Sequence, residues 1–261
     1  MKNFWIRFLS GFLYASLITT AVFYSNLSFK VLITILSIIV LKEYFNLIKN
    51  TNYFFFLIVL SFIWTPRNLV IDDYLIKFIC YISLISSIYC TFLLFFKRNF
   101  KNSKINVFFS LVNITTSYFF MIEIHKYGAI FSPLYLFLFF SSTWVNNIFA
   151  YLTGSYFGKN KILEKISPNK TWEGFFGGLF ASLIFIYFME YYFNLFNNYW
   201  VLLGIIIPIL SLIGDLLQSL YKRKAKIKDS GNLIPGHGGA YDRMDSVIYS
   251  ALYYYLFLKL I

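Results

Sequence analysis

Long apolar runs recur along the chain and constrain its fold more than any other feature. Of the 261 residues, 59% are hydrophobic and 13% are charged, which lies outside the usual range for soluble globular domains. Crossing the hydrocarbon layer of a bilayer takes about 20 apolar residues in a helix, and a helix satisfies its own backbone hydrogen bonds there. The composition therefore predicts an integral membrane protein.

The apolar runs predict an all-α, polytopic membrane bundle of about nine transmembrane helices. The candidate helices cover residues 4–24, 30–48, 53–66, 74–96, 105–122, 130–153, 174–193, 199–217 and 246–261. We expect one membrane domain over 1–261, with N-terminal spans in 1–122 and catalytic spans in 130–261. A signal peptide also has a basic start followed by an apolar run. Because no clear cleavage site follows here, we favour a retained first span.

The distribution of basic residues predicts the orientation of the chain. Short cytoplasmic loops carry an excess of Lys and Arg, and with the N-terminus inside, nearly all the loop cations fall on the inner side. The intervening loops hold only Lys30, Arg67 and Lys126. We therefore predict a cell (inner) membrane protein with a cytoplasmic N-terminus. The polar loops 154–171 and 218–245 then face the cytoplasm.

The net charge of +12 also bears on partners. A strongly basic chain can bind nucleic acid, but no basic segment here matches a known nucleic-acid reader motif. We therefore expect contacts with membrane lipids and no nucleic-acid partner.

The segment 219–245 is a polar, glycine-rich stretch between two apolar runs. Its glycines allow positive φ, and successive N–H groups in such a loop can form an anion-binding concavity; a flexible surface turn is the alternative. Lys222, Arg223 and Lys228 can neutralise a triphosphate and a departing pyrophosphate, although such clusters also fix topology and contact anionic lipids. His237, placed between glycines, is expected to contact phosphate or ribose.

Three aspartates are candidate ligands for a divalent cation. Asp242 and Asp245 are three residues apart, so they share a face if the last helix begins there. Asp215 ends an apolar run, and an ionisable residue at that depth is by default a functional candidate. Mg²⁺ favours a few carboxylates together with phosphate oxygens and water. The alternative is that Asp215 pairs with a nearby Lys or Arg.

The other polar loop contains the compact turn SPNKT, residues 167–171. Asn169 or Thr171 can cap the helix that follows, and Glu173 then falls in the first turn of that helix. This capping role leaves Ser167 and Lys170 available to bind an anion.

At this point the segment 219–245 resembles the signature of the CTP:phosphatidate cytidylyltransferases, also called CDP-diacylglycerol synthases. The matching positions are Ser219, Lys222, Arg223, Lys228, Asp229, Gly231, Pro235, His237, Gly238, Gly239, Asp242, Arg243 and Asp245. GSYFGK at 154–159, SPNKTWEG at 167–174 and the Gly-Asp pair at 214–215 are similar to family segments in the same order. The resemblance covers about the last 120 residues by motif, and the N-terminal half by its pattern of spans.

The resemblance implies a homodimeric membrane enzyme of phospholipid biosynthesis. Such an enzyme transfers CMP from CTP to phosphatidic acid and releases CDP-diacylglycerol and pyrophosphate. It implies Mg²⁺ held by Asp215, Asp242 and Asp245, and leaves room for a second, monovalent cation. The catalytic candidates are Asp215, Lys222, Arg223, Lys228, Asp229, His237, Asp242, Arg243 and Asp245. The candidates for binding phosphate groups are Ser167, Asn169, Lys170, Ser219, Gly236, Gly238 and Gly239.

Several positions depart from the family pattern. Tyr221 and Ala240 replace bulkier or more typical aliphatic residues, and two further departures concern carboxylates. Asn147 stands where family members usually carry Asp, and Gln218 stands where they usually carry Glu. An amide oxygen can still bind a cation, but the loss of charge leaves two alternatives open. The chain could be a CTP-dependent transferase or kinase acting on another lipid, or it could be a transporter or an inactive lipid-binding paralogue.

Overall fold

Long helices make up almost the whole structure, a computed structural model that describes residues 2–49, 73–96, 104–127, 132–196, 199–233 and 238–261. The elements are α1 (Lys2–Tyr24), α2 (Asn26–Ile48), α4 (Asp73–Phe96), α5 (Lys104–His125), α6 (Pro133–Phe157), β1 (Lys161–Leu163), β2 (Ser167–Thr171), α7 (Trp172–Phe193), α8 (Trp200–Ala225) and α9 (Tyr241–Leu260). The candidate helix at 53–66 lies outside the described residues.

Helix length and composition confirm an all-α membrane protein. Within the described residues, the apolar helices α2, α5, α7, α8 and the Tyr74–Phe96 part of α4 are long enough to cross a membrane. The 23 residues of α2, for example, span about 35 Å at 1.5 Å per residue, against a hydrocarbon layer of about 30 Å. The count of nine spans and the orientation of the N-terminus stay predictions.

Several helices extend beyond the apolar runs that predicted them. α8 continues to Ala225, where Lys226 takes a left-handed conformation with φ 58° and caps the helix. α9 begins at Tyr241, five residues before the apolar run at 246. Hydropathy marks where a segment stops being apolar, whereas a helix continues as long as its residues tolerate helical geometry. The loop expected over 218–245 is therefore shorter, and both of its ends are helical.

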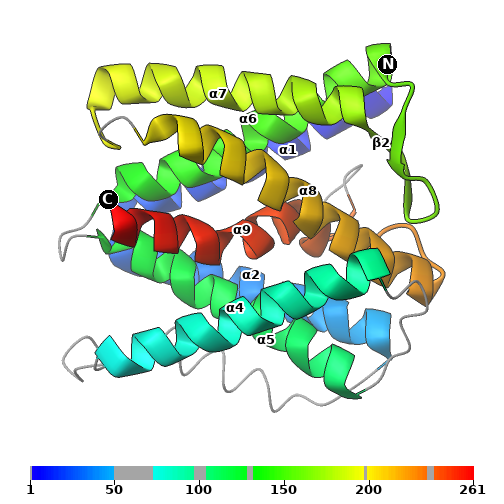
Figure 1. The fold of residues 1–261 in the computed structure, drawn as a ribbon, viewed down its shortest axis with the longest axis horizontal. Coiled ribbons are helices and arrows are strands. Elements are labelled where there is room, and N and C mark those ends of the chain that lie inside the picture. The colour runs from blue at the N-terminus through cyan, green and yellow to red at the C-terminus, as the bar shows by residue number, and fades with distance from the viewer. Residues whose placement is uncertain (1, 50–72, 97–103, 128–131, 197–198, 234–237) are drawn as a thin grey trace.

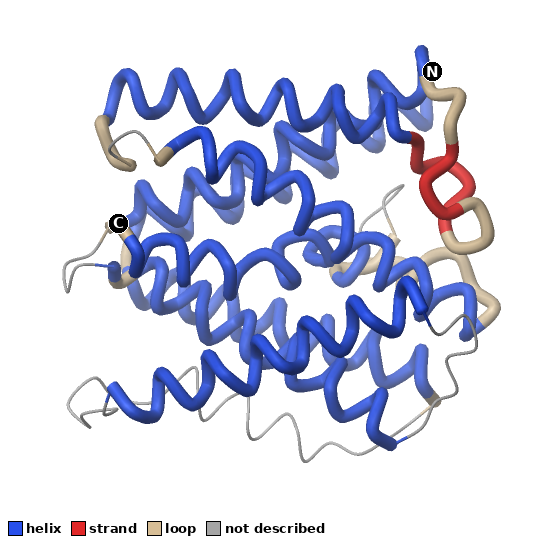
Figure 2. The backbone as a smooth tube through the Cα atoms, in the orientation of Figure 1, coloured by secondary structure: helices blue, strands red, loops and turns tan. Residues whose placement is uncertain are grey.

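A small two-stranded sheet forms where the sequence predicted an irregular polar loop. β1 pairs antiparallel with β2, with Lys161 opposite Thr171 and Leu163 opposite Ser167. This hairpin lies at the same end of the bundle as the loop that follows α8 (Figure 2). Arg223 joins the two, because its Nε donates to the Ile166 carbonyl at 3.2 Å. Within the part of the chain that the structure describes, the fold is thus all-α except for this hairpin.

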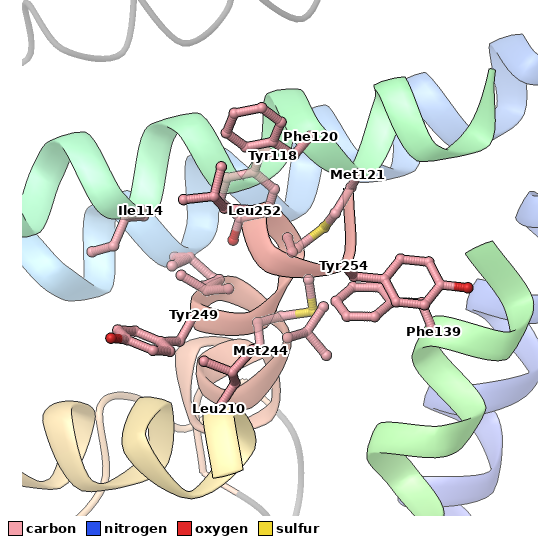
Figure 3. Close-up of a cluster of buried hydrophobic side chains, with 14 of the residues drawn as sticks. Ile114, Tyr118, Phe120, Met121, Phe139, Leu210, Met244, Tyr249, Leu252 and Tyr254 are labelled. Carbon is pink, nitrogen blue, oxygen red and sulfur yellow. The ribbon is translucent and has the colours of Figure 1, made fainter. Parts of the chain in front are cut away.

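α9 lies at the centre of the helices and carries the core. It packs against α8 and α5, while α6 packs on α7 and α7 on α8. Figure 3 shows Leu252 and Tyr254 of α9 among side chains of α5 and α6. The Tyr254 ring stacks on Phe139 with 4.9 Å between the ring centroids. A helix buried on nearly all sides fixes the position of whatever its first turn carries.

The burial of α9 predicts a specific loss of stability. Leu252→Ala removes a side chain that is 2% exposed and should destabilise the protein by about 2–5 kcal/mol. Leu202→Ala is the matched control, because Leu202 is 46% exposed on α8. The temperature at which each variant loses its monodisperse peak in detergent measures the loss of stability for both substitutions. Equal effects of the two substitutions would contradict the central place of α9.

Candidate active site

Asp242 lies in the first turn of α9, and its carboxylate accepts hydrogen bonds from α8 and from the loop before α9. Its Oδ1 accepts from Lys222 Nζ at 2.6 Å and from Gln218 Nε2 at 2.9 Å. Its Oδ2 accepts from the backbone N–H of Ser230 at 2.8 Å and of Gly239 at 2.9 Å. Gln218 and Lys222 are one helical turn apart, so both face the same carboxylate. Asp242 therefore connects the end of α8, the start of α9 and the loop between them, 226–240, which is called the glycine loop below and is described at 226–233 and 238–240.

Gly238 makes this arrangement possible. Its φ is +86°, a region that residues with a Cβ rarely enter. A Cβ built there would lie 2.6 Å from Asp242 Oδ2. The sequence predicted that backbone N–H groups of this loop bind an anion. In the structure, the N–H of Gly239 donates to the Asp242 carboxylate. Pro235, Gly236 and His237 lie outside the described residues.

Asp215 of α8 and Asp245 of α9 interact electrostatically at a point where the two helices approach closely. A Cβ on Gly214 would lie 2.5 Å from the Asp245 carbonyl, so the two backbones are nearly in contact there. Asp215 forms an ion pair with Lys170 of β2 and accepts a weak bond from Ser219 Oγ at 3.4 Å. Asp245 is buried and interacts electrostatically with both Asp215 and Lys170. The ammonium of Lys170 in the hairpin thus pairs with Asp215 and interacts electrostatically with Asp245.

The environment of Lys170 keeps it charged. Burial by itself lowers the pKa of its ammonium, because a charge is costly away from water. The Asp215 carboxylate opposes this, with a further contribution from Asp245, and the pKa is raised above its ordinary value. Lys170 therefore stays protonated at neutral pH. Its ion pair with Asp215 is the alternative role that the sequence analysis left open for this aspartate.

A cavity of about 290 Å³ opens beside this ion pair. It lies between α6, the hairpin, the start of α7 and α8. Its polar lining includes Asn147, Lys161, Asn169 and Lys170, and its apolar lining includes Pro208 and Leu212. Cavities of this kind, mostly apolar with a few convergent polar groups, are typical ligand sites. The cationic lining favours an anionic ligand.

The start of α7 is organised as the sequence predicted. Thr171 Oγ1 accepts from the N–H of Gly174 at 3.2 Å and caps the helix. Glu173 falls in the first turn, and its carboxylate accepts from the N–H of Lys159 at 3.1 Å and from Asn160 Nδ2 at 2.7 Å. The capping prediction for Thr171 is confirmed. These bonds hold the base of the hairpin, which positions Lys170.

The two amides that depart from the family pattern are built into the same region. Asn147 Oδ1 accepts from Ser211 Oγ at 2.9 Å, and its Nδ2 donates to Ser246 Oγ at 3.2 Å. Asn147 therefore bridges α6, α8 and α9. Gln218 donates to Asp242, which an ionised Glu at that position would repel. Both amides donate a hydrogen bond from their nitrogen, which an ionised carboxylate cannot do.

The remaining candidates divide into those near these carboxylates and those away from them. Arg243 is half-buried and interacts electrostatically with Asp245, Asp242 and Asp215. Ser167 pairs within the hairpin, and Arg223 holds the hairpin turn. Lys228 and Asp229 are exposed on the loop after α8.

One buried carboxylate at the site was missed at the sequence level. Glu43 of α2 is 7% exposed. It accepts from Ser230 Oγ at 2.8 Å and from the backbone N–H of Ala240 at 3.0 Å and of Tyr241 at 2.9 Å. The available signal was a glutamate near the end of an apolar run, since ionisable residues there are functional candidates by default.

The three aspartates differ in their fitness to hold a divalent cation. Within the described residues, no group of three His, Cys, Asp or Glu side chains is arranged to hold a metal ion. Asp215 and Asp245 do share a cationic partner, Lys170, so their charges suit a cation between them. Asp215 has one cation and one hydroxyl as partners, whereas Asp242 accepts from Lys222, Gln218 and two loop N–H groups and has less room for a further ligand.

The helical fold and the charged site beside a cavity define a polytopic membrane protein with a polar candidate site at one end of its bundle. The model of the Cytidylyltransferase family matches residues 5–261. The chain therefore belongs to the Cytidylyltransferase family.

Several bacterial relatives are similar to just under half of the chain. The phosphatidate cytidylyltransferase of Staphylococcus aureus (strain COL) is 45% identical over 117 residues, which are 44% of this chain and 45% of that protein. The protein of the same name from Aquifex aeolicus (strain VF5) is 41% identical over 128 residues, which are 49% of this chain and 48% of that protein. The matched region thus spans about half the length of these curated relatives.

The backbone at Gly238 predicts a sharp response to substitution. Gly238→Ala places a Cβ 2.6 Å from Asp242 Oδ2 at a positive φ, and a residue forced into such a region costs about 1–3 kcal/mol. Gly11→Ala in α1 is the control, because alanine is favoured inside a helix. Melting temperature in detergent compares the two. A Gly238→Ala protein as stable as Gly11→Ala would refute the loop geometry.

Proposed function

We propose that this protein transfers CMP from CTP to phosphatidic acid and releases CDP-diacylglycerol and pyrophosphate. The observation that carries the proposal is the Lys170–Asp215 ion pair at the edge of a cavity with cationic donors. Membership of the Cytidylyltransferase family and relatives named phosphatidate cytidylyltransferase support the choice of substrates. The product would enter phospholipid biosynthesis.

The proposed reaction is an in-line displacement at the α-phosphorus of CTP. A phosphate oxygen of phosphatidic acid forms the new P–O bond. The bond between the α-phosphorus and its bridging oxygen to the β-phosphate breaks, and pyrophosphate leaves with the electron pair. Because the attacking oxygen is already anionic, no strong general base is required. Catalysis then depends on positioning and on neutralising charge, as in other phosphoryl transfers.

The cavity residues suit those two tasks. Lys161 and Lys170 offer ammonium groups to phosphate oxygens, and Asn169 offers an amide donor. Pro208 and Leu212 on the α8 wall offer an apolar surface to lipid. Lys222 and Arg223 lie one turn from the loop and can offset the charge of the departing pyrophosphate.

Mg²⁺ is the cofactor that this chemistry calls for. When bound, it would neutralise the phosphate oxygens and orient the triphosphate. We propose Asp215 and Asp245 as its ligands, because they already share a cation. We assign Asp242 to holding the glycine loop, since its oxygens are engaged there. Asp229, on the exposed loop, stays the candidate for positioning or for a second, monovalent cation.

We also propose that the site faces the cytoplasm from the inner membrane. The hairpin and the basic end of α8 lie together at one end of the bundle, and cytoplasmic ends carry the excess of Lys and Arg. Nucleoside triphosphates are found on that side. The homodimer implied by the family resemblance is part of the same proposal.

Labelled nucleotide distinguishes the proposed reaction from its alternatives. With Mg²⁺ and phosphatidic acid, the purified protein should move label from the α-phosphorus of CTP into lipid and release pyrophosphate. Label moving from the γ-phosphorus would instead identify a lipid kinase. Transfer only to a different lipid in a panel would identify another transferase, and no transfer or pyrophosphate release would indicate an inactive paralogue.

Removal of the Lys170 charge tests the role of the Lys170–Asp215 ion pair, on which the proposal rests. Lys170→Met should lower kcat/KM for CMP transfer by about 10²-fold or more, the usual cost of losing a preorganised charge-stabilising donor. Lys165→Met is the control, because Lys165 is an exposed lysine in the turn of the same hairpin. Asp215→Ala should abolish transfer with the protein still folded in the membrane. Full turnover by either site variant would remove that residue from the mechanism.

A further inference from the structure

Glu43 is a buried carboxylate that the proposed reaction does not use. It comes from α2, in the N-terminal half of the chain, yet its hydrogen-bond partners among the described residues lie at the two ends of the glycine loop. A buried carboxylate is costly unless hydrogen bonds compensate for its lost hydration. Here that compensation comes from Ser230 on one side of the loop and from Ala240 and Tyr241 on the other.

The contact with Ala240 and Tyr241 supplies a helix cap from another part of the chain. Ala240 is the N-cap residue of α9, and it has no side-chain cap bond. Glu43 accepts from the N–H of both residues, which are donors without partners inside the helix. A carboxylate at this point also interacts favourably with the positive end of the helix dipole. Glu43 therefore caps α9 in place of a local Ser, Thr or Asp.

The glycine loop is shaped to rest on the same carboxylate. A Cβ on Gly231 would lie 2.6 Å from Glu43 Oε1, and a Cβ on Gly239 would lie 2.3 Å from Glu43 Oε2. Only residues without a side chain allow the backbone this close. Ser230 Oγ lies 2.8 Å from Glu43 and 3.0 Å from Asp242 Oδ2. One hydroxyl thus links the α2 carboxylate to the site.

We propose that Glu43 is a positioning residue that sets the glycine loop and the first turn of α9, and thereby places Asp242 and Asp245 against Lys222, Asp215 and Lys170. It touches none of the proposed reacting atoms. Its effect on turnover rests on the proposed CMP transfer, whereas its effect on the loop does not. Because it acts through geometry, its loss lowers kcat more than it raises KM.

The kinetic test compares two amide substitutions on one helix. Glu43→Gln places an amide N–H₂ toward backbone N–H donors and should lower kcat by about tenfold to a hundredfold, as expected for a site displaced by roughly 1 Å. KM for CTP should change by less than about threefold, since binding groups and their charges are retained. Lys42→Gln is the matched control, because Lys42 is the exposed neighbour on α2.

A second readout is independent of activity. Lys226 and Lys228 are exposed at the start of the loop, so trypsin cleavage after them reports how firmly the loop is held. In membranes, Glu43→Gln should speed this cleavage, whereas Lys42→Gln should not. If the wild type proved to have no CMP transfer, the proposed function would fail, but the cleavage comparison would still decide the role of Glu43.

Ser230→Ala covers the case in which Glu43→Gln does not accumulate as folded protein. It removes one hydroxyl that joins Glu43 to Asp242, and it should speed loop cleavage and lower kcat in the same direction. The double variant should then show less than the product of the two single effects, because both act on one network. Wild-type cleavage and kcat in Ser230→Ala, or effects of Glu43→Gln equal to those of Lys42→Gln, would overturn the proposal.

Discussion

The neutralisation of carboxylates where α8 meets α9 is the constraint on which the rest of the site depends. A carboxylate near the apolar interior is stable only with donors or cations at hand. Asp242, with a side chain 8% exposed, meets this condition with Lys222, Gln218 and loop amides. The pair formed by Asp215 and Asp245 meets it with one ammonium from the hairpin. Asp242 is therefore neutralised by α8 and the loop before α9, and the Asp215 and Asp245 pair by the hairpin.

This requirement explains why segments far apart in sequence converge. α8 must continue past its apolar run so that Gln218 and Lys222 face the head of α9. The hairpin folds back onto α8, where Lys170 pairs with Asp215. α2 places Glu43 within hydrogen-bond distance of both ends of the glycine loop. The cavity then opens beside the hairpin lysines. Lys170 thus stabilises the buried charges and also belongs to the groups proposed to bind substrate phosphates.

The amides Asn147 and Gln218 fit the same account. Each donates a hydrogen bond within the site, Asn147 to Ser246 and Gln218 to Asp242. A negative charge at either position would add to a region that already holds several carboxylates. Their presence is therefore compatible with a working site.

Much of the helical frame could be predicted from the sequence, because about 20 apolar residues in a row leave few alternatives to a membrane helix. The cap at Thr171 was predictable too, since it depends on neighbours in the chain. The ends of α8 and α9 were not, because polar residues can continue a helix that hydropathy no longer marks. The hairpin was missed because its strands are only 3 and 5 residues long and carry no alternating pattern.

The sequence by itself determined the protein class and the family signature, and it named the candidate site residues, because these depend on composition and on local spacing. Only the tertiary structure decided which charges meet. The spacing of Asp242 and Asp245 suggested a shared role, whereas packing gave Asp242 to Lys222 and set Asp245 beside Asp215 and Lys170. Glu43 gained its place at the glycine loop only when α2 packed against it, since no local pattern relates residues almost 200 positions apart.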